Sequence, residues 1–482
     1  MNFELDYQLN CDASHNKCFF IHLKEGKATI QIYRHAKGGI SLYRTIPLSF
    51  HPISSGWIND NIFLLSDREL FYLDVSSCSL QQLYLPKYKI VDLVCLTHQG
   101  NFVYSSIVDP DYIDFHMRTN NGEFQVARYH IRKNELFFSD VITSPEKEFI
   151  DNYVNECHSS FEGGISDELN GHILKIERSP LYSKLFVDKS CIANEFGCID
   201  RAFFFGSEII YTISSLISPS SIQIIHYRNN ILIDPIVQNQ NNSLFSVAYC
   251  SEDMLDIYHY TLSNNITKRG LVVMLHGGPA GRYSNRFDPM AFSFAEKGFA
   301  VYLLNYPGST GYDYSYQEEL YGKGGTVDLF AVIKSIKTLN QKYKDCPLYL
   351  IGDSYGGYLA ILTLIKIESG ISKVYATNAF TDIRYQFLFS CARSVITKYF
   401  PAISSPEIRK INPIDLVTHG QLKDRLLIIN GVNDPYCPKQ QILQFAELSG
   451  CDFELLADYP HYKVDLNETA KISNIIIRDI GV

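Results

Sequence analysis

The spacing of apolar and polar residues divides the chain into two parts with different predicted structure. Up to about residue 228, short apolar runs such as Phe19-Phe20-Ile21-His22-Leu23 alternate with polar turns. Short runs that recur between turn residues predict an antiparallel, all-β region. Blades of a β-propeller, at roughly 40–50 residues each, would explain this density of strands. We therefore predict a β-propeller-like domain over residues 1–228, and about five such blades would fill this length.

The second part of the chain alternates buried strands with helical segments. Residues 270–275, 299–304 and 426–430 are mostly apolar and predict strands, and residues 328–339 have helical periodicity. Strands that alternate with helices indicate a mostly parallel, doubly wound sheet covered on both faces. We predict such an α/β domain over residues 229–482, with the wholly polar run 238–242 near the join between the two domains.

Composition and charge exclude several classes of protein. The 482 residues are 46% hydrophobic and 20% charged, a balance typical of globular proteins, and the net charge is −9. Binding to nucleic acid needs a basic patch, which this balance does not favour. The N-terminus has no apolar segment of the kind that opens a signal peptide, and no run of about eighteen apolar residues predicts a membrane span. We expect a cytoplasmic protein with no membrane or nucleic-acid partner.

The cysteines do not suggest a disulfide framework or a metal site. Twelve cysteines are scattered along the chain without a C-x-x-C pair. In a chain without an export signal, such cysteines are expected to be reduced thiols. A structural zinc site would need close ligand spacing that this sequence lacks. We therefore expect neither a metal nor an organic cofactor.

The segment Gly352-Asp353-Ser354-Tyr355-Gly356-Gly357 carries the clearest chemical signal. It follows the apolar run 347–351, which predicts a strand, and precedes residues 358–365, which predict a helix. A G-x-S-x-G motif between strand and helix is the nucleophile elbow of an α/β-hydrolase. The glycines are needed because the sharp turn leaves no room for a Cβ on either side of the serine. Ser354 is the predicted nucleophile.

An activated serine needs a general base, and that base needs an acid to orient it. In α/β-hydrolases the chain order is serine, acid, histidine. Asp434 lies just beyond the apolar run 426–430, and His461 follows further along the chain. Taken alone, each would be unremarkable as a turn aspartate or a surface histidine. His419 precedes Asp434 and breaks the order, so we predict Ser354, Asp434 and His461 as the catalytic triad.

An oxyanion hole needs two backbone N–H donors. One is predicted to come from Tyr355, the residue after the nucleophile. The other is predicted from His276-Gly277-Gly278-Pro279, which directly follows the strand predicted at 270–275. Glycines there allow the backbone to approach the substrate oxygen closely.

These segments together resemble the prolyl oligopeptidase family of serine peptidases, in its acylaminoacyl-peptidase and dipeptidyl-peptidase branch. The resemblance rests on residues 276–279, on Asn305-Tyr306-Pro307-Gly308-Ser309-Thr310-Gly311-Tyr312 and on the elbow, which occur in family order. It covers about residues 250–482. It implies the same triad and, for the oxyanion hole, the N–H groups of Gly278 and Tyr355. It also implies that the N-terminal region is a propeller that caps the active site and limits substrate size.

The sequence departs from the family at three positions. Pro307 and Tyr436 stand where relatives commonly carry arginines, and Pro460 stands where a glycine usually precedes the catalytic histidine. Relatives use the arginine two residues after the acid to bind a substrate carbonyl. A phenol at this position can donate one hydrogen bond but lacks the charge and fork geometry of arginine. We predict Tyr436 as a substrate-binding residue.

Three functions compete at this stage. The first is a serine peptidase that cleaves short peptides or N-blocked amino acids through an acyl-enzyme. The second keeps the triad but passes the acyl group to an amine or alcohol, as in an acyltransferase, cyclase or esterase. The third is a non-catalytic propeller module that binds a partner. The expected partner is a short peptide or small acyl substrate, and a homo-oligomer is left open.

Overall fold

The computed structural model of the chain describes both parts of the protein. The described residues are 5–12, 14–36, 39–52, 54–58, 61–65, 70–83, 92–94, 97–98, 101–102, 112–118, 124–130, 135–138, 164–228, 231–232, 244–250, 255, 257–264, 269–367, 369–457, 459–461 and 466–482.

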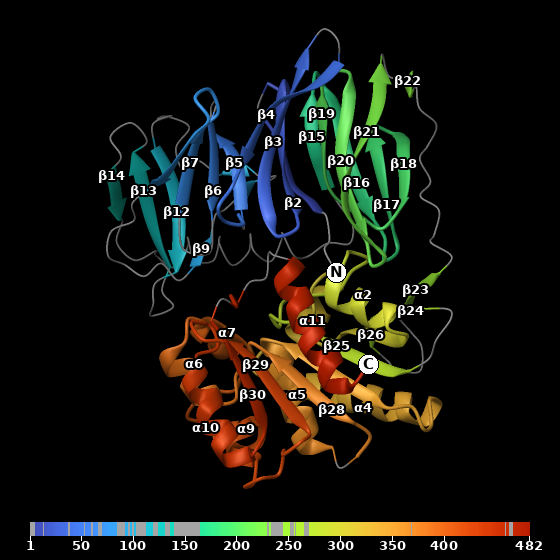
Figure 1. Ribbon diagram of the computed structural model, residues 1–482, viewed down its shortest axis with the longest axis vertical. Coiled ribbons are helices and arrows are strands. Elements are labelled where there is room, and N and C mark those ends of the chain that lie inside the picture. The colour runs from blue at the N-terminus through green and yellow to red at the C-terminus, as the bar shows by residue number, and fades with distance from the viewer. Residues whose placement is uncertain are drawn as a thin grey trace.

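The N-terminal part consists of antiparallel sheets, each built mostly from consecutive strands (upper half of Figure 1). Two four-stranded sheets come first: β1 (Leu5–Cys11), β2 (Lys17–Lys24), β3 (Lys27–Ala36) and β4 (Gly39–Pro47), then β5 (Ser54–Ile58), β6 (Asn61–Leu65), β7 (Leu70–Asp74) and β8 (Ser79–Leu83). The next contains β9 (Asp92–Val94), β12 (Tyr112–Arg118), β13 (Phe124–His130) and β14 (Glu135–Phe138), with the pair β10 (Thr97–His98) and β11 (Asn101–Phe102) beside it in sequence. Two more follow: β15 (Gly164–Leu169), β16 (His172–Arg178), β17 (Tyr182–Val187) and β18 (Ser190–Phe196), then β19 (Cys198–Phe205), β20 (Glu208–Ser215), β21 (Ser218–Arg228) and β22 (Ile231–Leu232).

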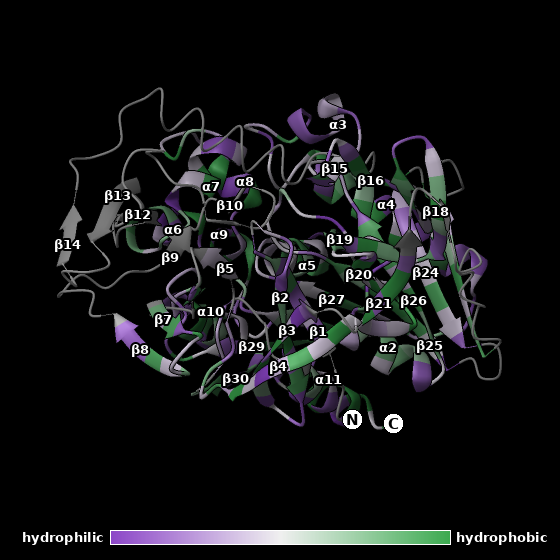
Figure 2. Cartoon of the chain, turned by 90° about the horizontal axis from the view of Figure 1, so that it is seen from above, coloured by the Kyte–Doolittle hydropathy of each residue, from purple (hydrophilic) through white to green (hydrophobic). Residues whose placement is uncertain are grey.

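The first and last of these four-stranded sheets lie side by side. Buried side chains of β1 and β2, among them Leu9 and Phe20, pack with Phe203 and Phe205 of β19 in one apolar cluster. Arg201 also donates to Asn10 across the two sheets, at 2.6 Å. Hydrophobic and hydrophilic stretches alternate along β4 (Figure 2). The two ends of the N-terminal domain are therefore joined through their side chains.

The C-terminal part contains one eight-stranded sheet (lower half of Figure 1). Its strand order is β23-β24-β26-β25-β27-β28-β29-β30. The first two strands pair antiparallel with their neighbours, and β26 through β30 run parallel. The bounds are β23 (Phe245–Cys250), β24 (Tyr258–Asn264), β25 (Gly270–Leu275), β26 (Phe299–Asn305), β27 (Leu348–Asp353), β28 (Lys373–Thr377), β29 (Leu426–Gly431) and β30 (Asp452–Leu456).

Helices cover both faces of this sheet. The helices are α2 (Pro289–Glu296), α3 (Tyr314–Glu318), α4 (Val327–Lys342), α5 (Tyr355–Lys366), α6 (Ile383–Phe389), α7 (Arg393–Tyr399), α8 (Ile408–Ile411), α9 (Pro413–Leu416), α10 (Lys439–Ser449) and α11 (Leu466–Ile480). Helices α4, α5 and α10 bury their apolar side chains in one core cluster. Helices α2 and α11 pack together in a second cluster on the opposite face. The predicted fold class, an N-terminal β domain before an α/β-hydrolase domain with a mostly parallel sheet, is confirmed. Residues 229–230 and 233–243, around the predicted join, lie outside the described residues.

Buried polar contacts connect the two domains. Asn285 is 2% exposed. Its side-chain amide donates to the carbonyl of Leu181 at 2.8 Å and accepts from the N–H of Leu216 at 3.0 Å. Because Asn285 lies in the loop that leads from the segment 276–279 to α2, these bonds fix that loop against the β domain.

None of the helices in the described part of the chain combines the length and apolar character needed to span a membrane.

Candidate active site

Ser354 lies between β27 and α5 in a strained backbone conformation, with φ 53° and ψ −115°. A side chain at Gly352 would place its Cβ 2.1 Å from the carbonyl oxygen of Gly356, and one at Gly356 would come within 2.3 Å of the carbonyl oxygen of Leu275. Both contacts are far shorter than van der Waals distance, so both positions require glycine. The strain holds the serine at the carboxyl end of the sheet, where ligands of α/β proteins bind.

The side chains of Ser354, His461 and Asp434 form one connected line. Ser354 Oγ lies 3.1 Å from His461 Nε2, and His461 Nδ1 lies 2.7 Å from Asp434 Oδ2. The other carboxylate oxygen, Oδ1, accepts the backbone N–H groups of Tyr436 at 2.8 Å and Cys437 at 3.0 Å. Asp434 is 4% exposed, so both of its oxygens are held in fixed roles.

The structure therefore brings together three residues that follow β27, β29 and β30, within reach for proton transfer. His419, the other histidine beyond the elbow, is exposed in the connection between α9 and β29.

The predicted oxyanion residues flank Ser354. Tyr355 is the first residue of α5, where a backbone N–H has no partner within the helix. Gly278 has φ 125°, and a Cβ there would lie 2.6 Å from the N of Ala280. A Cβ at its neighbour Gly277 would lie 3.3 Å from Ser354 Cβ. A loop without side chains thus packs directly against the nucleophile.

His276, which precedes these glycines, has a structural role. The sequence analysis treated it only as part of the segment 276–279. Its Nε2 lies 2.7 Å from Ser309 Oγ, and its ring stacks on Tyr306 at 4.4 Å between centroids. Tyr306 in turn donates its hydroxyl to the carbonyl of His276 at 2.7 Å. Burial lowers the pKa of His276 to about 4, so the ring is neutral at pH 7 and ties the glycine loop to the segment 305–312.

Asp328 is a second supporting residue that sequence analysis missed. It lies in the first turn of α4, is fully buried, and accepts the hydroxyl of Tyr355 at 2.8 Å. Tyr355 is 1% exposed and packs against Tyr358, Phe380 and Phe400. Asp328 therefore helps to hold the residue whose N–H is predicted to face the oxyanion. The only signal in the sequence was an aspartate in the first turn of a predicted helix, which is common.

Asp328 should make stability depend on pH. Burial raises the pKa of Asp328 to about 6 from 3.8, although the Tyr355 hydroxyl acts in the opposite direction. Between about pH 4 and 6 the unfolded chain ionises first, so the free energy of unfolding falls as the pH rises, by up to about 3 kcal/mol. Above about pH 6 Asp328 is ionised in the folded protein as well, and the free energy of unfolding has fallen by this full amount. Asp328→Asn cannot ionise and keeps an acceptor for Tyr355, so this variant should gain stability relative to wild type over that interval.

The measurement is urea unfolding of both proteins at about pH 4, 5, 6 and 7. Parallel curves of free energy against pH would show that Asp328 does not titrate between these values.

Tyr436 is buried beside the base. It is 5% exposed, and its ring lies 4.7 Å from that of His461 between centroids. Its carbonyl accepts the side-chain amide of Gln386, and it packs with Cys391. The ring of Tyr436 thus lies beside the imidazole of His461.

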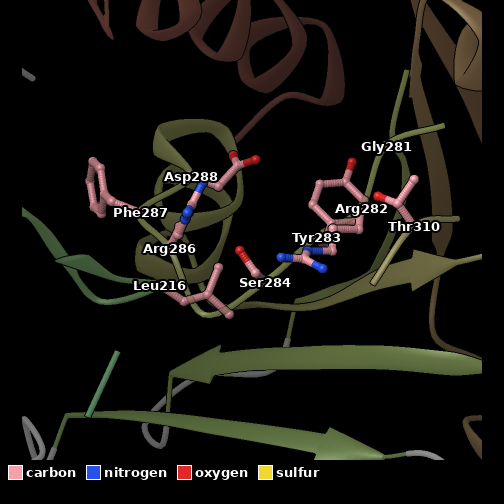
Figure 3. A pocket seen from close by; sticks show the side chains of 9 residues that line it. All are labelled: Leu216, Gly281, Arg282, Tyr283, Ser284, Arg286, Phe287, Asp288 and Thr310. Carbon is pink, nitrogen blue, oxygen red and sulfur yellow. The ribbon is translucent and has the colours of Figure 1, made fainter. Parts of the chain in front are cut away.

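Two cavities adjoin these residues. One, of about 330 Å³, lies beside the elbow, and Gly277, Gly352 and Asp353 are among its lining residues. The other, of about 370 Å³, lies at the domain junction and is lined by Leu216, Gly281, Arg282, Tyr283, Ser284, Arg286, Phe287, Asp288 and Thr310. In Figure 3 the guanidinium group of Arg282 extends toward Ser284, on the side of the pocket that Leu216 of the β domain approaches. Tyr283, Phe287 and Asp288 line both cavities, so the two adjoin.

Part of the sequence is similar to known proteins. Residues 285–450 match the model of the prolyl oligopeptidase family. The acylamino-acid-releasing enzyme of Mus musculus is 27% identical over 187 residues, which are 36% of this chain and 25% of that protein. The enzyme of the same name from Sus scrofa is 33% identical over 191 residues, 37% of this chain and 26% of that protein. The match thus spans about a quarter of the length of these relatives.

Solved structures resemble the whole chain in fold. The uncomplexed acylaminoacyl peptidase of Pyrococcus horikoshii superimposes with a TM-score of 0.61 at 12% identity, and the match covers 99% of this chain and 95% of that one. An acylaminoacyl peptidase in complex with Z-Gly-Gly-Phe-chloromethyl ketone gives a TM-score of 0.60 at the same identity and coverage. At this identity the likeness establishes the arrangement of both domains and nothing finer.

Proposed function

We propose that this protein is a serine peptidase that cleaves amide bonds of short peptides or N-blocked amino acids, because residues 285–450 match the model of the prolyl oligopeptidase family. The observation that carries the proposal is the line of contacts from Ser354 through His461 to Asp434, with distances of 3.1 and 2.7 Å. The names of the relatives support amide substrates, among them an acylamino-acid-releasing enzyme and a dipeptidyl peptidase family member of Caenorhabditis elegans.

The proposed reaction begins when Ser354 Oγ attacks the carbonyl carbon and its proton passes to His461 Nε2. Asp434 keeps the imidazole in the tautomer that has its lone pair on Nε2 and stabilises the imidazolium that forms. The N–H groups of Tyr355 and Gly278 would stabilise the negative oxygen. The C–N bond then breaks, and the amine leaves with the proton from His461. Water attacks the acyl-enzyme by the same route, which releases the acid and restores the serine.

We propose a β-propeller for the N-terminal domain, in the role of a filter on substrate size. The side-by-side packing of its first and last sheets supports a closed arrangement. The contacts of Asn285 with Leu181 and Leu216 support this role, because they join the β domain to the loop that leads from the proposed oxyanion residues. A covered site admits flexible chains and excludes folded ones.

Digestion of peptides of rising length, an unfolded protein and a folded protein tests this filter. The rate per bond should fall steeply beyond a few tens of residues, by the steric argument for an enclosed site. Efficient cleavage of the folded protein would rule the filter out. Ser354→Ala assayed in parallel identifies contaminating peptidase activity.

Acyl transfer to an amine or alcohol is the second candidate. It is favoured by Tyr436, which lies against His461 where relatives place a carbonyl-binding arginine, so the site offers less charge for a peptide. Product analysis in the presence of added amines distinguishes the two functions. Hydrolysis products alone support the peptidase, whereas preferential formation of amides supports transfer. Failure of Ser354 to react with a fluorophosphonate would instead support the third candidate, a binding module.

We also propose a cytoplasmic location. The ten cysteines within the described residues are free thiols, which suits a reducing compartment.

A further inference from the structure

We propose that Asp434, Cys437 and His461 form a binding site for a thiophilic divalent cation such as Zn²⁺, and that occupancy of this site reversibly blocks the triad. Binding itself does not depend on the proposed peptidase activity. The inhibition rests on that activity.

The three residues offer an oxygen, a sulfur and a nitrogen ligand within 4.8 Å of one another. In tetrahedral Zn²⁺ sites, bonds of about 2.0–2.3 Å place ligand atoms roughly 3.3–3.8 Å apart. A shift of about 1 Å or less in each side chain would therefore close the site around an ion. A set that contains thiolate and imidazole selects Zn²⁺ or Cd²⁺ over Mg²⁺ or Ca²⁺, which prefer oxygen ligands throughout.

The proposed catalytic reaction does not use the sulfur of Cys437. Contacts of its backbone and side chain hold this residue in position. Its backbone N–H donates to Asp434 Oδ1 at 3.0 Å, and its Sγ lies 3.9 Å from Gln386 Nε2. Cys437 is only 1% exposed, and the side chain of Asp434 is 0% exposed. The side chain of His461 is 10% exposed, so a cation would enter from the side of the imidazole.

A bound cation would leave the imidazole of His461 unable to accept the proton of Ser354. Coordination at Nε2 would occupy the lone pair that accepts this proton, whereas coordination at Nδ1 would move the ring proton from Nδ1 to Nε2. As the cation binds, the thiol of Cys437 gives up its proton to solvent and becomes a thiolate ligand. Either geometry stops acylation, and a chelator that removes the cation should restore it.

The first test is a titration of wild type, Cys437→Ala, Cys437→Ser and Cys451→Ala with ZnCl₂. Cys451 is a matched control because it is also buried but lies outside the cluster. Each rate of fluorophosphonate labelling is expressed relative to the rate of the same variant in chelator. The concentration of Zn²⁺ that halves labelling should rise at least about tenfold in the Cys437 variants and stay unchanged in Cys451→Ala. No inhibition of wild type, or equal inhibition of all four proteins, would overturn the proposal.

The second test measures binding without activity. Ser354→Ala titrated with Cd²⁺ should develop the ultraviolet charge-transfer absorption of a cadmium thiolate at one equivalent. In the double variant Ser354→Ala, Cys437→Ala, the absorption that develops with the first equivalent of Cd²⁺ should be absent. The other thiols should give the same signal in both proteins. Identical titrations of the two proteins would refute the site, and this result stands even if the chain proves to have no peptidase activity.

Discussion

Ser354→Ala should lower kcat by roughly five to six orders of magnitude, the scale expected when the nucleophile of a triad is lost. The strained turn presents this hydroxyl to His461 Nε2, at 3.1 Å. Alanine at this position keeps the backbone and the oxyanion N–H groups but removes the covalent route. The small remaining rate should come from substrate positioning and the oxyanion hole.

The measurement is turnover of a peptide and an activated ester, with mass spectrometry of the fluorophosphonate adduct. Ser335→Ala is a suitable control, because Ser335 is buried in α4 and its hydroxyl donates to Ala331. The adduct should map to Ser354 in wild type and in Ser335→Ala. An adduct on another serine, together with full activity of Ser354→Ala, would refute the assignment.

Asp434→Asn should lower kcat by about four orders of magnitude with little change in fold. Oδ1 of Asp434 accepts two backbone N–H groups, those of Tyr436 and Cys437. An asparagine must keep its oxygen on that side and therefore turns its NH₂ toward His461 Nδ1. The ring then carries its proton on Nε2 and cannot accept the proton of Ser354.

Two histidine variants serve as controls for the proposed effect of Asp434 on the tautomer of His461. His461→Ala should be as inactive as Ser354→Ala, because residues of a triad act as a unit. His419→Ala should retain full activity, since His419 is exposed outside the site. Asp434→Asn with activity within about tenfold of wild type would show that Asp434 does not set the tautomer.

The elbow was predictable because its chemistry is local. The strain of the turn, the glycines around Ser354 and the adjacent strand and helix all occupy one continuous segment. Asp434 and His461 were predictable for a different reason: the carboxyl ends of parallel strands share one edge of a sheet. The position just past a strand end favoured Asp434, and the chain order then favoured His461 over His419.

The supporting residues could not be predicted, because their partners are distant in sequence. The contact between Asp328 and Tyr355 joins two helices, and the contact between His276 and Ser309 joins two loops. A buried aspartate and a solvated one have the same sequence pattern, and only packing decides whether the carboxylate loses water. Tyr436 shows the same limit, since its identity was evident from the sequence but its position against the imidazole was not.

The sequence alone therefore determined the order of the two domains, the parallel sheet and the identity of the candidate triad, since each depends on local periodicity or on chain order. The tertiary structure alone decided how the β domain meets the hydrolase through Asn285, which carboxylate supports Tyr355, and that the thiol of Cys437 lies beside the base and its acid. These are side-chain contacts between separate elements. Their energies depend on burial and on distances of a few ångströms, which no spacing along the chain specifies.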